Sequence, residues 1–202
     1  MKEESVKNYG IVLLAAGTSS RLGMPKQLLE YKGETLLNKA IREAKETEVH
    51  AIVVVLGAEA HTLKESIKDQ DVDFEFNERY TEGMASSIRC GVDYLLKHYP
   101  SIENVIFMAC DQPHVDAAHL LALMDRHFLT GAGIVASEYA EKKGVPALFN
   151  KIFFEELTML KGDIGARKMM EIHATDTVGV PFPRGVVDVD TMEAYRKLKN
   201  HD

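Results

Sequence analysis

The sequence has few of the residues that mark several protein classes. Of its 202 residues none is tryptophan and only two are cysteines, Cys90 and Cys110. Two isolated cysteines form neither a disulfide framework nor a zinc site of the usual spacing, so a reduced, cytoplasmic location is expected. His114 and His119 also lack a metal-ligand spacing and are expected at the surface. No apolar run approaches the roughly 18 residues of a membrane span, and the N-terminus lacks a signal-peptide core.

Positive charge is also in short supply. The 24 Lys and Arg residues are outnumbered by 31 Asp and Glu residues, which gives a formal net charge of −7. Proteins that bind nucleic acids or anionic membranes need a basic surface, so neither partner is expected. A small anionic ligand remains compatible with this charge, because a local basic pocket can hold it against the overall sign.

Apolar runs of strand length alternate with helical patterns along the chain. The runs occur at 11–16, 51–56, 73–77, 104–109, 132–137, 144–149 and 175–180. Helical patterns occupy 35–44, 58–68, 88–96, 117–128, 151–160 and 191–199, and a further helix begins at 162–167. This alternation predicts an α/β protein with a mostly parallel sheet and helices on both faces. Pro146 is typical of an edge strand or a bend.

The segment from Gly10 to Leu29 joins the first strand to a small, polar loop that contains two cations. Gly17 ends the apolar run, and Arg21 and Lys26 follow within the loop. Small residues after a strand let backbone N–H groups approach an anion, and the two cations add neutralisation, so the loop predicts a polyphosphate site. It is neither a Walker loop nor a G-x-G-x-x-G fingerprint. An ordinary strand-to-helix connection is the alternative.

Acidic residues follow the fourth strand and precede the last helix. Asp111 comes directly after 104–109, and a carboxylate at the carboxyl end of a central parallel strand lies where open α/β sheets bind ligands. Mg²⁺ pairs few carboxylates with substrate phosphates, so Asp111 is a candidate ligand; forming the turn before the next proline is the alternative. Asp190 with Glu193 fits a helix capping box, whereas Asp188 is freer to face a metal.

Polar residues at two further helix starts have both a local and a functional interpretation. Ser86 and Ser87 can cap their own helix, which is the favoured interpretation, or contact a base, ribose or phosphate. Asp163 is expected to cap the helix that begins near 162–167. Arg167 is either an anchor for a second substrate or part of a solvated helix face.

Taken together, the motifs resemble a known family. LAAGTSSRLGMPKQLL at 14–29 is similar to the signature loop of nucleotidyltransferases. CDQP at 110–113, GVPALF at 144–149, GDIGAR at 162–167 and DVDT at 188–191 resemble the molybdenum cofactor cytidylyltransferase branch, which is related to the molybdenum cofactor guanylyltransferase. The resemblance implies a Rossmann-like three-layer α/β/α fold of the nucleotide-diphospho-sugar transferase type, with one nucleotidyltransferase domain over residues 1–202. It also implies Mg²⁺-dependent transfer of a nucleoside monophosphate onto a molybdopterin-type cofactor, with release of pyrophosphate.

The same resemblance implies roles for individual residues. Catalysis would involve Arg21, Lys26 and Asp111. Nucleotide binding would involve Leu14, Ala15, Ala16, Gly17, Arg21, Lys26, Asn77, Ser86 and Ser87. The acceptor side would contain Pro146, Asp163 and Arg167, and the metal would be held by Asp111 with Asp188 and, second, Asp190. The paired alanines resemble cytidylyltransferases, whereas the guanylyl branch tends to have a second glycine, so CTP is expected rather than GTP.

Other functions remain open. The isoprenoid-pathway enzyme that transfers CMP to a methylerythritol phosphate shares the loop but is not expected to carry CDQP or GDIGAR. An accessory protein for molybdenum hydroxylases, or an oxidoreductase-type relative, could dispense with Lys26 or Asp111, and this chain keeps both. A dinucleotide-dependent enzyme would be expected to carry the glycine fingerprint. The implied partners are CTP or GTP, a molybdopterin-type cofactor and a client molybdoenzyme.

Overall fold

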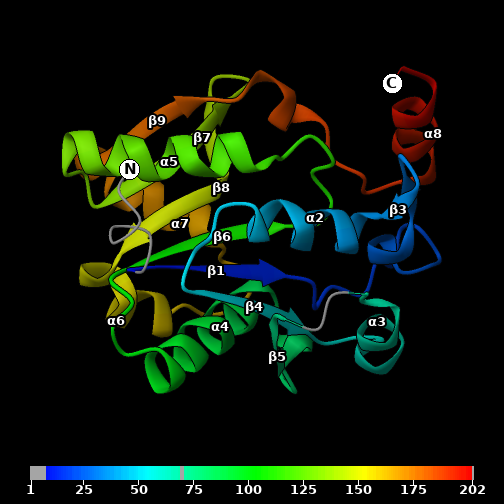
Figure 1. Ribbon diagram of the computed structural model, residues 1–202, viewed down its shortest axis with the longest axis horizontal. Coiled ribbons are helices and arrows are strands. Elements are labelled where there is room, and N and C mark those ends of the chain that lie inside the picture. Colours follow the sequence, from blue (N-terminus) through cyan, green and yellow to red (C-terminus); the bar gives the residue numbers. More distant parts are fainter. Residues whose placement is uncertain (1–7, 69–70, 202) are drawn as a thin grey trace.

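A seven-stranded sheet organises the chain, with the strand order β5-β4-β1-β6-β8-β7-β9 (Figure 1). The computed structural model describes residues 8–68 and 71–201. The strands are β1 (Tyr9–Leu14), β4 (Ala51–Leu56), β5 (Asp73–Phe76), β6 (Asn104–Ala109), β7 (Ile134–Tyr139), β8 (Lys142–Asn150) and β9 (Thr177–Pro181). Among these, β8 is antiparallel to both of its neighbours, and the other pairings are parallel. A separate two-stranded ribbon pairs β2 (Glu30–Tyr31) with β3 (Glu34–Thr35). The predicted mostly parallel sheet is therefore confirmed.

Helices cover both faces of this sheet. The α-helices are α2 (Leu36–Lys45), α3 (Ala60–Ser66), α4 (Met84–His98), α5 (Ala117–Thr130), α6 (Phe154–Thr158), α7 (Ala166–Ile172) and α8 (Met192–His201). Short 3₁₀ helices occupy Lys26–Leu28, Tyr80–Glu82, Lys151–Phe153, Ala174–Asp176 and Pro183–Val186. The core on one face joins β1 to α2, α3 and α5, and the core on the other joins it to α4, α6 and α7. The three-layer α/β/α arrangement is thus confirmed.

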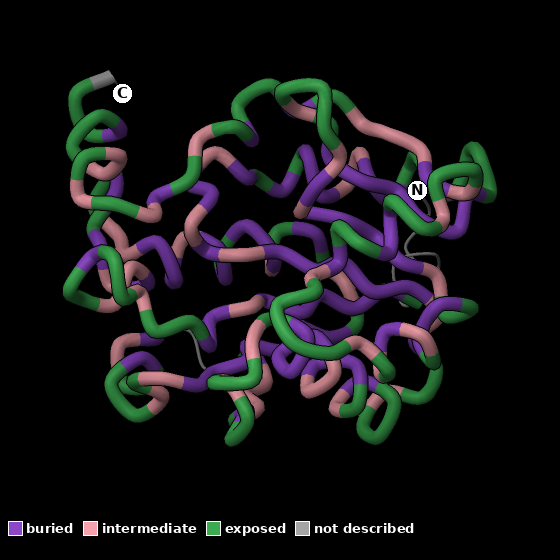
Figure 2. Tube along the Cα trace, turned by 180° about the vertical axis from the view of Figure 1, so that it is seen from behind, coloured by how far each residue is buried: buried purple, intermediate pink, exposed green. Residues whose placement is uncertain are grey.

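The continuous apolar strands arise because both faces of the sheet are buried. Side chains alternate along a strand, so Ile11 and Leu13 enter one core while Val12 enters the other. Figure 2 shows the buried trace concentrated in the middle of the molecule and the exposed trace in the outer loops and helices. A third, smaller core packs α8 against the β2–β3 ribbon. Within the part of the chain that the structure describes, every helix is too short or too polar to cross a membrane.

Two of the predicted helix caps, Asp163 and Asp190, are wrong. Asp116 caps α5, since its carboxylate accepts from the N–H of His119. Asp163 does not cap α7, because that helix begins only after Gly165 and has no side-chain cap. Asp190 does not cap α8 either. The Thr191 hydroxyl accepts from the N–H of Ala194, while the Asp190 carboxylate binds basic side chains from the start of the chain.

Pro146 does not lie at an edge of the sheet. Its strand, β8, runs between β6 and β7. The edge prediction is therefore wrong, but the expected irregularity is present: the pairing register with β7 shifts between Ala136 and Ser137. Proline can occupy an interior strand at such a shift because one ladder hydrogen bond is already interrupted there.

The expectation that His119 lies at the surface is also wrong. Its side chain stacks on Phe182 with ring centres 4.1 Å apart, and the residue is 8% exposed. Its Nε2 lies 2.7 Å from the hydroxyl of Ser137, which itself donates to the carbonyl of Pro146. Since that hydroxyl hydrogen is used, Nε2 of His119 is the donor. Burial lowers the pKa of His119 to about 4, so the ring is neutral near pH 7.

Candidate active site

The loop after β1 and the turn after β6 lie next to each other because these strands are neighbours in the sheet. Leu14 pairs with Ala109 at the carboxyl ends of the two strands. The β1 strand ends at Leu14, so Ala15 and Ala16 belong to the loop rather than to the predicted strand. The chain therefore places the basic loop and the CDQP segment at one edge of a parallel sheet, where ligand sites of this architecture occur.

A cavity of about 400 Å³ opens at this edge. Of the predicted site residues, those that line it are Leu14, Ala16, Gly17, Lys26, Ser87, Asp111 and Asp163. Several lining residues were not predicted, among them Gln27, Tyr80, Met84 and Val145. Gln27 follows the candidate lysine directly, which was the available sequence signal. Val145 and Met84 lie close in the sequence to the predicted Pro146 and Ser86, which was a similar signal, whereas Tyr80 had none because its approach to the loop depends on the tertiary fold.

Four charged side chains beside the cavity form one network. The Lys26 ammonium donates to Asp111 at 2.5 Å and to Asp190 at 2.9 Å. Arg21 donates to the second oxygen of Asp190 at 2.8 Å. Burial would lower the pKa of Lys26, but Asp111 and Asp190 outweigh it and hold this pKa above its usual range. The lysine therefore stays charged at neutral pH and can neutralise an anion, but it cannot act as a base.

A third carboxylate, Asp188, lies near the two in this network. Burial, Asp190 and Asp111 raise the pKa of Asp188 above its usual value. The pKa of Asp190, which burial alone would raise, is instead lowered because Lys26 and Arg21 stabilise its charge. Carboxylate oxygens are the ligands that a hard divalent cation prefers, so their grouping here is compatible with one.

Side chains alone do not form a metal site in the part of the chain that the structure describes. Among the residues that the structure describes, no group of three or more histidine, cysteine, aspartate or glutamate side chains is arranged to hold a metal ion. Mg²⁺ does not need such a group, since it commonly binds one or two carboxylates together with substrate phosphates and water. Asp111 and Asp190, which share the Lys26 ammonium, fit this kind of site, and Asp188 lies near them.

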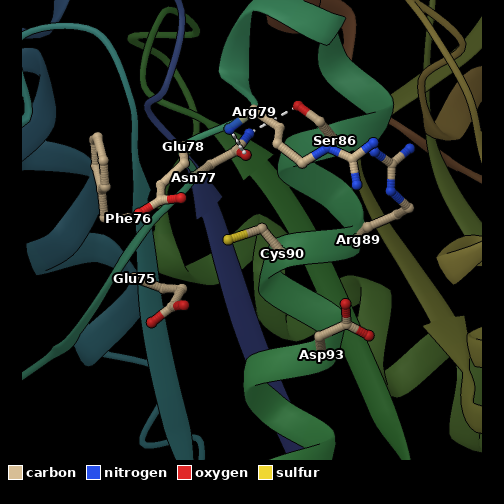
Figure 3. A pocket seen from close by; sticks show the side chains of 9 residues that line it. All are labelled: Glu75, Phe76, Asn77, Glu78, Arg79, Ser86, Arg89, Cys90 and Asp93. Atoms are coloured by element: carbon tan, nitrogen blue, oxygen red, sulfur yellow. Dashed lines mark hydrogen bonds between the residues drawn. The ribbon is translucent and has the colours of Figure 1, made fainter.

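Asn77, Ser86 and Ser87 form a second polar cluster, at the start of α4. The Asn77 amide donates to both serine hydroxyls, at 2.8 and 3.0 Å. Neither serine caps the helix; its N-cap is Gly83, whose carbonyl accepts from the Ser86 hydroxyl. The favoured capping interpretation is therefore wrong. Ser87 lines the main cavity, whereas Asn77 and Ser86 line a neighbouring pocket of about 380 Å³ between β5 and α4 (Figure 3).

The three residues predicted for the acceptor side do not come together. Asp163 lines the main cavity near Gly83. Arg167 instead lies in a separate surface groove with Lys142 and Lys143. Pro146 does not line the main cavity, although Val145 before it does. The structure thus brings Asp163 to the main cavity and leaves Arg167 outside it.

Known proteins match both the sequence and the fold. The family profile of the MobA-like NTP transferase domain matches residues 11–178. Nicotine blue oxidoreductase of Paenarthrobacter nicotinovorans is 38% identical over 199 residues, which cover 93% of this chain and 94% of that protein. Purine catabolism protein PucB of Bacillus subtilis strain 168 is 26% identical over 199 residues, with the same coverage. The crystal structure of Rv0371c from Mycobacterium tuberculosis H37Rv, a complex with manganese, superposes with a TM-score of 0.80 at 27% identity, covering 97% of this chain and 100% of that one.

The matched region includes the basic loop, the CDQP turn and the strands that hold them side by side. Lys26 and Asp111 line the cavity, and Arg21 and Asp190 join them in the network beside it, an arrangement that agrees with the binding of a nucleoside triphosphate. The chain belongs to the family of MobA-like NTP transferase domains, and it is a nucleotidyltransferase.

Proposed function

We propose that the protein transfers CMP from CTP onto the phosphate of a molybdopterin-type cofactor and releases pyrophosphate. One observation supports this proposal above the others: Lys26, from the loop after β1, is bound to Asp111, from the turn after β6. A cation and a carboxylate are therefore available together at the cavity that the small, Gly-containing loop borders. Both cysteines are free thiols, which fits the expected cytoplasmic location.

The reaction needs no nucleophile from the protein. The attacking oxygen belongs to a phosphate, which is already anionic at neutral pH. The protein has to place it in line with the α-phosphorus and to offset the charge that develops on the leaving pyrophosphate. Arg21 and Lys26 supply positive charge for that purpose, and the loop supplies backbone N–H donors. Mg²⁺ at Asp111, with Asp190 or Asp188, would neutralise further phosphate charge.

Two observations support the binding of a divalent ion. The carboxylates beside Lys26 suit a hard cation, and the structure of Rv0371c was obtained as a complex with manganese. We choose Mg²⁺ because it is the ion that usually accompanies nucleoside triphosphates. CTP is chosen because Ala15 and Ala16 occupy the loop where a glycine would leave more room for a purine, and Ala16 lines the cavity.

A second candidate function comes from the relative with 38% identity, which is named an oxidoreductase. A relative of that kind would bind a redox substrate or a reduced dinucleotide and would not require an NTP. The sequence has no G-x-G-x-x-G after β1, since the loop reads AAGTSSRLG. We therefore rank this function second.

Pyrophosphate release separates the two functions. Purified protein is incubated with molybdenum cofactor, Mg²⁺ and one of CTP, GTP or ATP, and NADH oxidation is followed in a parallel reaction. We expect release of pyrophosphate with CTP, dependent on both the cofactor and Mg²⁺. Release with GTP alone would overturn the choice of base. NADH oxidation without pyrophosphate release from any nucleotide would overturn the proposed transfer.

A further inference from the structure

We infer that Gln27 is a positioning residue, whose amide holds the loop between Ala15 and Lys26 in the shape that receives the triphosphate. The residue is 1% exposed. Its Nε2 donates to the carbonyl of Ala15 at 2.9 Å and to the carbonyl of Gly17 at 3.2 Å. One buried side chain thus bonds the carbonyls on both sides of Ala16.

The other end of the Gln27 amide reaches the loop as well. Its Oε1 accepts from the Ser19 hydroxyl at 3.3 Å, and the same hydroxyl accepts from the backbone N–H of Lys26 at 3.0 Å. Ser19 has a positive φ of 51°, a conformation that residues other than glycine seldom adopt. These two bonds therefore hold Ser19 in an unfavourable conformation and connect it to the lysine that binds Asp111.

The direction of the carbonyls explains how this arrangement could serve an anion. In a trans peptide the C=O of one residue and the N–H of the next point in opposite directions. Turning the carbonyls of Ala15 and Gly17 toward Gln27 therefore directs the N–H groups of Ala16 and Thr18 away from it. Ala16 and Thr18 line the cavity. Gln27 thus removes carbonyl oxygens from the side where phosphate oxygens would bind and leaves N–H donors there.

Gln27→Glu is the most direct test, because it keeps the shape of the side chain. It replaces the donating nitrogen with an oxygen that repels the carbonyls of Ala15 and Gly17. Ser19→Ala removes the hydroxyl bridge without a buried charge and covers the case in which Gln27→Glu fails to fold. Asn38→Asp is the matched control. Asn38 is also buried, and its amide joins α2 to the end of α3 by bonding the carbonyl of Ser66 and the N–H of Lys68.

Binding of inorganic tripolyphosphate with Mg²⁺, measured by calorimetry, is the main readout, since it depends on neither the base nor the acceptor. We expect Gln27→Glu to weaken it about tenfold or more and Ser19→Ala about threefold, with Asn38→Asp unchanged. Hydrogen exchange of the peptide spanning residues 15–22 should be faster in Gln27→Glu and Ser19→Ala than in the wild type. Turnover at saturating nucleotide should be lower in the same two variants.

Gln27 acts on phosphate binding whatever the acceptor is, so a failed transfer to molybdenum cofactor would leave this result standing. Binding by both loop variants within twofold of the wild type would overturn the positioning role. An equal loss of binding in Asn38→Asp would assign the effect to general destabilisation and would overturn it as well. Absence of tripolyphosphate binding by the wild type would also overturn the positioning role.

Discussion

Replacing Lys26 with methionine removes the ammonium that two carboxylates share and keeps most of the aliphatic side chain. The ammonium lies 2.5 Å from Asp111 and 2.9 Å from Asp190, and these side chains are 19% exposed for Lys26 and Asp111 and 31% exposed for Asp190. Without it, Asp111 loses its ammonium partner, Asp190 keeps only Arg21, and both carboxylates still repel the charge of Asp188. The variant should therefore be less stable than the wild type in the absence of ligands.

The size of the loss follows from the partial burial. Exposed ion pairs contribute about 0–1 kcal/mol, and breaking a fully buried pair costs about 3–5 kcal/mol. The intermediate exposure of this network places the loss in the free energy of unfolding at about 2 kcal/mol. For a chain of this length the melting temperature should fall by about 4–8 °C.

A divalent ion should reverse part of this loss. The carboxylates without their ammonium can bind Mn²⁺, and a ligand present at about 100 times its Kd stabilises by about 2.7 kcal/mol. We expect Mn²⁺ to raise the melting temperature of Lys26→Met more than that of the wild type in differential scanning fluorimetry. Pyrophosphate release by the variant should nevertheless fall at least about 100-fold, because the charge on the phosphates is no longer offset.

Lys39→Met is the matched control for this experiment. Lys39 is also largely buried, at 13% exposure, and pairs with Glu43 at 3.1 Å, but it contacts the carbonyl of Val115 rather than the cavity. It should lose stability without a stronger response to Mn²⁺ and without a large loss of turnover. The reasoning would be refuted if Lys26→Met melted like the wild type, or if Mn²⁺ stabilised both proteins by the same amount.

Three further substitutions test separate features. Asp111→Asn should lower pyrophosphate release at least about 100-fold while circular dichroism shows an unchanged fold, because the neutral amide is a poor ligand for a divalent ion; near-normal release would exclude that role. Burial lowers the pKa of His119 from 6.5 to about 4. The neutral, buried ring therefore contributes its full stability to the folded protein above pH 6.5, and this stability is lost as the pH falls toward 4. The wild type should lose about 2 kcal/mol between pH 7 and pH 5 in urea denaturation through this group, and His119→Gln should remove that part of the pH dependence. Gly83 has φ +98°, and a Cβ there would lie 2.7 Å from the carbonyl of Gly162; Gly83→Ala should cost about 1–3 kcal/mol in the same assay, and an unchanged urea midpoint would contradict it.

Strand positions could be predicted where burial alone determines the pattern. The apolar runs 51–56 and 104–109 coincide with β4 and β6, because strands covered on both faces need apolar residues at every position. The meeting of Lys26 with Asp111 was expected only from the family resemblance, because the sequence places each residue after a strand but does not show that β1 and β6 are neighbours in the sheet. Local sequence was therefore sufficient for the strands, whereas the contact needed the resemblance or the strand order itself.

Other features depend on partners that are distant in the sequence. The Asp190–Glu193 spacing fits a capping box, but Asp190 bonds Lys26 and Arg21, which are 164 and 169 positions away. His119 is buried because Phe182 stacks on it, and no spacing near His119 indicates this. Gln27 lies in a loop without hydrophobic periodicity, so its burial could be found only from the folded chain.

The shared ammonium also predicts how nucleotide and metal should depend on each other. When Lys26 turns from Asp111 and Asp190 to a phosphate, Asp111 is left without a cation and Asp190 with Arg21 alone, unless another cation binds them. A triphosphate should therefore bind weakly without a divalent ion and at least about tenfold more tightly with one, and the metal should show the same coupling toward the nucleotide. Calorimetry of CTP with and without Mn²⁺, and of Mn²⁺ with and without CTP, measures both sides. Lys26→Met should reduce this coupling, because its carboxylates are already without the ammonium before the nucleotide arrives. A coupling of the same size in the variant and the wild type would show that the lysine does not exchange between carboxylate and phosphate.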